Sequence, residues 1–159
     1  MLMEPQTRIS DKALKVWRIR GMINSILFLS FCGSVVTLSN IFEWPSWIAA
    51  LAIGTAIIYS YVFILLMPKL RWKRWRYEVR ETEIELQQGV LFMKRTLIPM
   101  IRVQHVDTKQ GPILKKYNLA SVAVSTAATV HEIPALDEAE AEELRYYIGN
   151  LTRVADEDV

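Results

Sequence analysis

Two histidines and a nearby carboxylate are the first residues in this sequence that could do acid–base chemistry. His105 and Asp107 stand two positions apart, so in a regular strand they would share one face and could form a His–carboxylate pair. No serine or cysteine stands in a recognisable nucleophile setting, and His131-Glu132 lacks a second metal-binding histidine. The sequence has neither a CxxC pair nor a glycine-rich phosphate loop. We therefore expect no enzyme, and no catalytic, cofactor-binding or metal site.

A run of cations and tryptophans offers a second kind of chemistry. Residues 69–76 read KLRWKRWR, in which the rings could stack on bases and the cations could meet phosphates. Directly after a membrane span, the same composition is typical of an interfacial anchor, with tryptophan at the headgroups and cations facing anionic lipid. The elements that precede the run decide between these interpretations.

Two long stretches without Asp, Glu, Lys or Arg precede the basic run, at residues 22–42 and 46–67. At about 1.5 Å per residue, each is long enough to cross a hydrocarbon core of roughly 30 Å. The remaining residues are too few to enclose two such helices in a soluble core. The pattern also differs from that of a cleaved signal peptide. The sequence therefore predicts a transmembrane helical hairpin that turns at Glu43-Trp44-Pro45.

The distribution of charge predicts the orientation of this hairpin. Lys and Arg cluster before the first span and after the second, whereas the turn carries only Glu43. Such an excess marks the cytoplasmic side, so we expect both termini there. Residues 69–76 are then an anchor, and nucleic acid is not an expected partner. The predicted membrane-interface residues are Trp17, Lys69, Arg71, Trp72, Lys73, Arg74, Trp75 and Arg76.

Small residues inside the spans suit close helix–helix approach in lipid. Cys32 is predicted to pack against the neighbouring helix. The further small candidates are Gly33, Ser34, Ala49, Ala50, Ala52, Gly54 and Ala56. Neither span contains a charged side chain, which argues against a transporter that acts alone.

Three segments are expected outside the spans. Residues 1–21 form a juxtamembrane segment in which Ser10 or Asp11 can cap a short helix. This helix would either lie along the membrane surface or extend the first span. Pro68 closes the second span, and residues 68–153 form a cytoplasmic domain. Residues 154–159 are expected to be a flexible tail.

Alternation with a period of two predicts antiparallel strands in this domain. A hairpin is expected from Trp75 to Gly89, followed by strands at Val90–Ile98, Ile101–Val106, Leu119–Ser125 and Thr129–Ile133, and then a helix capped by Asp137 and Glu140. Its apolar positions recur at helical spacing, so it should pack on the sheet.

The stretch from Arg102 to Thr126 needs its own interpretation. Val103 and Val106 are three apart, so either both strand faces are covered or a bulge falls near Gln104-His105. Gln110-Gly111-Pro112 breaks the strand, residues 113–117 can form one helical turn, and Asn118 suits the left-handed position that ends it.

These motifs resemble a family. GVL at residues 89–91, IP at 98–99, RVQHVD at 102–107, QGP at 110–112, NLA at 118–120 and IPALDEA at 133–139 are similar to the membrane-associated bacterial pleckstrin-homology-like domains. The family was long catalogued as a domain of unknown function. Asn118 departs from the glycine that is frequent there. The resemblance spans residues 70 to 152, and two preceding spans also fit its short members.

The resemblance implies an α+β membrane protein, with a two-helix transmembrane hairpin followed by a pleckstrin-homology-like antiparallel β half-barrel and a C-terminal helix. It implies a bacterial cell (plasma) membrane location and transfers no catalytic residues. It also implies a complex with a larger related membrane protein that has repeated domains of this kind, with a role in envelope stress or antimicrobial resistance.

Three functions remain open at this stage. The first is a non-enzymatic membrane scaffold or subunit. The second is a binder of anionic lipid headgroups, for which Lys115 and Lys116 are candidate lipid or partner contacts. The third is an auxiliary subunit of a transporter.

Overall fold

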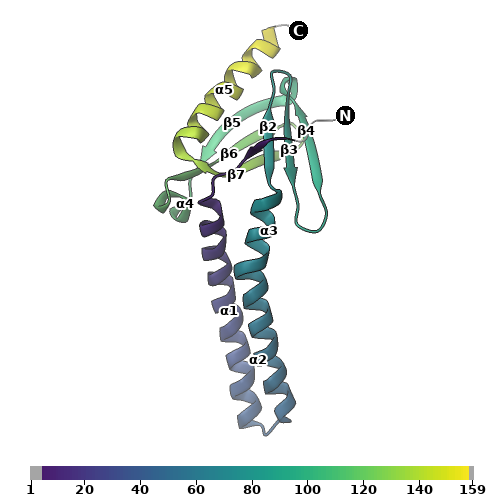
Figure 1. Cartoon of the computed structure of the whole chain (residues 1–159), viewed down its shortest axis with the longest axis vertical. Helices are drawn as coiled ribbons and strands as arrows, with labels where there is room; N and C mark the ends of the chain where they lie inside the picture. Colours follow the sequence, from purple (N-terminus) through teal and green to yellow (C-terminus); the bar gives the residue numbers. More distant parts are fainter. Residues whose placement is uncertain (1–4, 158–159) are drawn as a thin grey trace. The chain divides into compact units, whose positions relative to one another are not determined.

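The computed structural model describes residues 5–157, and the side chains up to Val154. The chain divides into two compact units, residues 14–70 and residues 1–13 with 71–159. The first is a pair of helices and the second a β-domain with a long helix, and both are drawn in Figure 1. The predicted segments at residues 1–4 and 158–159 lie outside the described part of the chain.

The helical unit is an antiparallel pair with a short turn (Figure 1). Helix α1 spans Ala13–Ile41, and the second helix spans Ser46–Arg74 as α2 (Ser46–Tyr61), the π-helical turn η1 (Val62–Leu66) and α3 (Met67–Arg74). Each is 29 residues long and apolar enough to cross a membrane. Only 17% of the residues in an apolar 18-residue stretch of the first helix are buried, and only 11% in that of the second. Apart from Phe42, both predicted spans therefore lie within continuous helices.

The first helix starts well before the predicted span. The backbone N–H of Lys12 donates to the Ser10 hydroxyl at 3.4 Å, and Ala13 donates to the Ser10 carbonyl at 3.0 Å. Of the two candidate caps, Ser10 is thus the one used. Because α1 continues unbroken from Ala13, the structure favours an extension of the span over a separate surface helix.

The helix does not end at Pro68, contrary to the expectation from sequence. Proline cannot donate to the carbonyl four residues earlier and its ring crowds that carbonyl. The π-helical turn Val62–Leu66 directly precedes it and contains that position, Ile64. A π turn lengthens the hydrogen-bonded loop, so the strain of the proline is absorbed and the helix continues to Arg74.

The two helices meet through small side chains. Cys32, Ala52 and Ala56 form a buried cluster, as predicted for Cys32. Gly33 and Gly54 do not contribute, since a Cβ at either position would meet nothing within 4 Å. A close approach lies instead at Gly21, where a Cβ would overlap the Phe63 carbonyl oxygen.

The first sheet of the β-domain has the strand order β1-β2-β3-β4 and is antiparallel throughout. Its strands are β1 (Thr7–Arg8), β2 (Arg76–Val79), β3 (Glu83–Gln88) and β4 (Lys94–Pro99). The sequence did not predict β1, which precedes the helix pair and pairs Thr7 with Tyr77 and Arg8 with Arg76. The helix pair is therefore an insertion between two neighbouring strands of one sheet.

The second sheet has the order β5-β6-β7, also antiparallel. Its strands are β5 (Val103–Lys109), β6 (Leu119–Thr126) and β7 (Val130–Asp137), and the 3-10 turn η2 (Met100–Arg102) links it to β4. The register shifts between Val103 and His105, so of the two alternatives left open by the sequence the structure has the bulge. A second shift between Ala120 and Val122 lies opposite Ala135, which has a φ of 52°.

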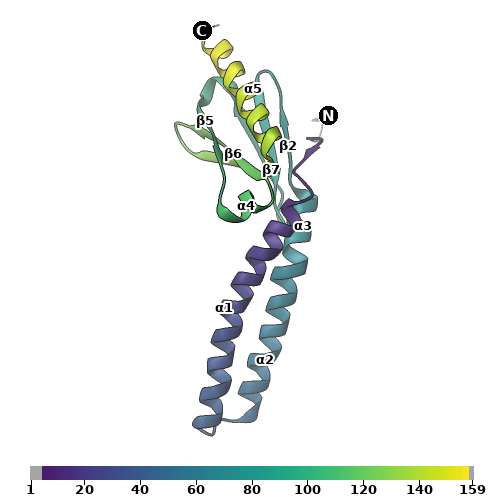
Figure 2. The same ribbon diagram turned by 90° about the vertical axis from the view of Figure 1, so that its left-hand side faces the viewer.

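Two helices complete the domain. Helix α4 (Pro112–Lys116) is the predicted short turn, and Asn118 follows it with a φ of 53°, as predicted. Helix α5 (Glu138–Glu157) packs on β5 and β6 and buries Ala141 and Ile148, so part of the predicted flexible tail is helical. Figure 2 shows α5 lying across the strands of the second sheet.

Candidate functional site

The predicted membrane-interface residues are divided between two settings. Helix α3 carries Lys69, Arg71, Trp72, Lys73 and Arg74. Strand β2 begins with Arg76. Trp72 is partly exposed, whereas Trp75 is 1% exposed and Trp17 is 9% exposed. For Trp75 the predicted headgroup contact is wrong, because a side chain enclosed by protein cannot also contact lipid.

Arg74 has a structural task that the sequence did not reveal. Its guanidinium Nη1 donates to the backbone carbonyl of Val90, in the loop between β3 and β4. The end of the second apolar helix is thus joined to this loop. A cation in a basic run gives no sequence signal for such a contact.

Lys115 and Lys116 lie on α4 and are exposed. The loop that holds them is well defined, since the Gln110 side-chain amide donates to the Leu119 carbonyl at 3.0 Å. Neither lysine forms an ion pair within residues 5–154, whose side chains the structure describes. Both cations are therefore available to an anionic lipid or protein surface.

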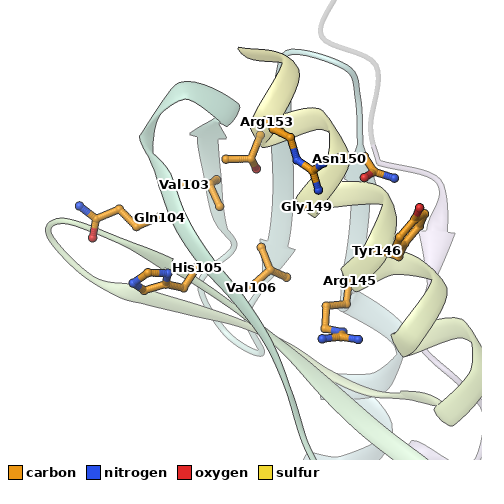
Figure 3. Close-up of a pocket in the computed structure, with 10 residues that line it drawn as sticks. Val103, Gln104, His105, Val106, Arg145, Tyr146, Gly149, Asn150 and Arg153 are labelled. Carbon is orange, nitrogen blue, oxygen red and sulfur yellow. The ribbon is translucent and has the colours of Figure 1, made fainter. Parts of the chain in front are cut away.

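A groove of about 390 Å³ separates β5 from α5 (Figure 3). Gln104 and His105 line it from β5, and Arg145, Asn150 and Arg153 line it from α5. The lining is polar and carries positive charge, and β5 is an edge strand of its sheet. Such an edge can accept an extended peptide as a further strand.

The two residues of the hypothetical His105–Asp107 pair have different positions relative to the groove. His105 lines the groove with two arginines, whereas Asp107 is not among the lining residues. The described residues also contain no group of three or more His, Cys, Asp or Glu side chains that could hold a metal ion. The groove is suited to binding an anionic or hydrogen-bonding group.

One wall of the groove is held by a charged contact between β5 and α5. The Thr108 hydroxyl donates to Glu142 at 2.9 Å, and Arg145 donates to the same carboxylate at 2.8 Å. These two donors, the Thr108 hydroxyl first, hold the pKa of Glu142 below its ordinary value. Arg145 is thereby oriented beside the groove.

A second, larger opening lies where the two sheets approach each other. It has a volume of about 550 Å³ and is lined by Leu97, Ile101 and His131 among others, with more apolar than polar surface. It lacks the cluster of cations that marks the β5–α5 groove, so its lining does not indicate one class of ligand.

The first sheet carries an ion-pair network that sequence analysis did not single out. Glu85 is 6% exposed and accepts from Arg95 at 2.7 Å and from Arg80 at 3.5 Å. Arg80 also pairs with Glu78 and Glu83, and these carboxylates, Glu78 first, raise its pKa. The alternation of charges along β2 and β3 was visible in sequence, but their pairing depends on strand register.

The family model described as bacterial PH domain matches residues 24–152. The chain belongs to the bacterial PH domain family. PH denotes pleckstrin homology, and the two antiparallel sheets with a C-terminal helix confirm the predicted fold class. The family match includes most of the helix pair as well as the β-domain, so both units belong to the family architecture.

Two proteins of Bacillus subtilis (strain 168) are similar to this chain. The UPF0699 transmembrane protein YdbS is 50% identical over 156 residues, which cover 98% of each chain. The UPF0699 transmembrane protein YdbT is 22% identical over 87 residues, which cover 55% of this chain but 17% of YdbT. YdbT is therefore several times longer than the matched region. No solved structure matches this chain.

Proposed function

We propose that this chain is a non-enzymatic integral membrane subunit that presents its PH domain to the cytoplasm. The observation that carries the proposal is the pair of 29-residue apolar helices inserted between two paired strands of the domain. Large apolar side chains such as Leu27, Phe31 and Ile57 are more than 60% exposed along these helices. Such surfaces require lipid or another apolar helix.

The proposed orientation rests on the distribution of cations. Lys12, Lys15 and Arg20 precede the first apolar stretch, α3 follows the second, and Glu43 lies at the turn. This asymmetry supports a multi-pass protein of the bacterial cell membrane with both termini inside.

The proposed partner is a longer membrane protein with domains of the same kind. Support comes from Bacillus subtilis, which encodes a similar short protein and a longer one with a similar segment. The edge strand β5 and its basic groove supply a surface for such a partner. A role in envelope stress or antimicrobial resistance is part of this proposal and follows from the resemblance alone.

Copurification tests the subunit proposal. The tagged full chain is expressed with its longer relative, extracted in mild detergent and purified. We expect a stoichiometric complex from the wild type, and a weakened one from Arg153→Glu, which reverses charge in the groove. Arg8→Glu, a charge reversal at an exposed position of β1 outside the groove, serves as the matched control. Recovery of the chain alone under all conditions would contradict the proposal.

Cysteine labelling tests the orientation. In a Cys32→Ala background, Ser46→Cys at the start of α2 should react with an impermeant maleimide in spheroplasts. Lys116→Cys in α4 should react only after lysis. The reverse pattern would place the PH domain outside the cell.

A specific observation favours a second function, the binding of anionic lipid. Lys115 and Lys116 are exposed on a well-defined turn, and each cation near an anionic surface adds roughly 1 kcal/mol. Reversing both charges should then reduce the anionic lipid that copurifies with the full chain. Unchanged lipid retention would exclude these lysines as the headgroup site.

A further inference from the structure

The loop between β3 and β4 exposes apolar side chains to an unusual degree. Leu91 is 78% exposed, Phe92 88% and Met93 48%, and Phe92 has the highest exposure among the large apolar side chains of the described residues. Consecutive exposed apolar residues at a hairpin tip are unfavourable in water. A surface that covers them would remove this cost.

The backbone conformation of this loop depends on Gly89. Gly89 has a φ of 142°, a conformation that residues with a Cβ rarely adopt. A Cβ at this position would also overlap the Phe92 carbonyl oxygen. The glycine therefore permits the turn after which Leu91 and Phe92 are exposed, whereas Ile84 and Leu86 of β3 are buried.

The loop is joined to the end of the second apolar helix. Arg74 donates to the Val90 carbonyl, the residue directly before the exposed tip. Arg74 follows Met67, the last residue of the uncharged stretch, by seven positions, which is about 10 Å along a helix. The headgroup layer is roughly 5–7 Å thick on each side of the hydrocarbon core. A chain segment of three residues reaches about 10 Å, so the tip can reach lipid.

The charge beside the tip also fits contact with lipid. Lys94 directly follows Met93 and is exposed, and no acidic residue lies between Gln88 and Lys94. Apolar residues followed by a cation suit the boundary between acyl chains and anionic headgroups. We propose that residues Leu91–Met93 insert into the interface of the bilayer that the chain's own helices cross, as a third membrane contact. This inference rests on the membrane crossing in the proposed function.

Depth measurements on the full chain test the insertion. In a Cys32→Ala background, Phe92→Cys carries an NBD fluorophore in nanodiscs of phosphatidylethanolamine and phosphatidylglycerol, at one chain per disc. Phe31→Cys, an exposed phenylalanine in α1, is the matched control for the span. Val154→Cys, an exposed apolar position of α5 followed by acidic residues, is the control for water.

We expect the label at position 92 to be quenched by nitroxide-bearing acyl chains and protected from aqueous iodide, as at position 31 and unlike position 154. Access to iodide equal to that at position 154 would overturn the insertion. Protection from both quenchers would overturn it as well, because the loop would then be covered by protein. If the label at position 31 also escapes lipid quenching, the spans themselves are not in the bilayer, and the proposed function falls with the inference.

Discussion

The Tyr77 hydroxyl donates a hydrogen bond of 2.8 Å to Glu140, across 63 residues of sequence. It joins β2 of the first sheet to the first turn of α5, which packs on the second sheet. Burial, followed by the hydrogen bond and charge of Glu140, raises the pKa of Tyr77, so the phenol keeps its proton at physiological pH. The contact connects the two sheets of the domain through the helix.

Removing this hydrogen bond should weaken the whole domain. Tyr77→Phe retains the ring and leaves the partly buried Glu140 without its donor, which costs about 1–2 kcal/mol of unfolding free energy. Thermal unfolding of the full chain in detergent, followed by near-UV circular dichroism, measures this loss. Tyr146→Phe is the matched control, since Tyr146 is 71% exposed. An equal effect of both substitutions would contradict the assignment.

The contact of Glu142 with Thr108 and Arg145 makes the stability of the α5–β5 packing depend on pH. A carboxyl whose pKa is lowered by folding stabilises the folded state above its unfolded pKa, near 4.5. That contribution is lost as the pH falls through the lower folded value. Stability measured from pH 6 to pH 3 should therefore decline less in Glu142→Gln than in the wild type. Glu143→Gln, at the exposed next position, should follow the wild-type curve.

Two glycine substitutions should have opposite effects. Gly89→Ala imposes a left-handed φ and a clash on a residue with a Cβ, and should destabilise the domain by at least about 1 kcal/mol. Gly149→Ala lies within α5, where a Cβ would meet nothing within 4 Å, and should stabilise it by about 0.5–1 kcal/mol. Chemical denaturation of the two variants measures both signs. A neutral Gly89→Ala would show that the turn adapts easily.

The helix pair should be sensitive at Gly21. Gly21→Ala places a methyl group against the Phe63 carbonyl, and should cost about 1–3 kcal/mol through separation of the helices. The midpoint of unfolding in sodium dodecyl sulfate, followed by helical circular dichroism, reports this change. Gly33→Ala should have little effect, because that position is open. Equal sensitivity at both glycines would argue against the close approach.

Much of this molecule is determined by local patterns in the sequence. Two uncharged stretches of about 20 residues suffice to predict the apolar helices, because length and the absence of charge act within each stretch. The left-handed Asn118 was also predictable, since backbone preference is a local property. The spacing of Val103 and Val106 left a bulge beside His105 as one of two alternatives, and strand pairing decided between them. The family motifs lie at the same turns and strand ends.

Other features depended on residues that are distant in sequence. Strand β1 is only two residues long, and its pairing with β2 became visible when the fold brought Thr7 beside Tyr77. The burial of Trp75 depends on packing around it, and the loop tip at Phe92 became notable only because nothing covers it among the described residues. The sequence by itself determined the apolar helices and the strands other than β1, although β4 begins at Lys94 and not at Val90 as expected. The tertiary structure decided the inserted position of the helix pair, the groove beside β5 and the link from Arg74 to Val90, because contacts between distant segments are a property of the folded chain and not of local composition.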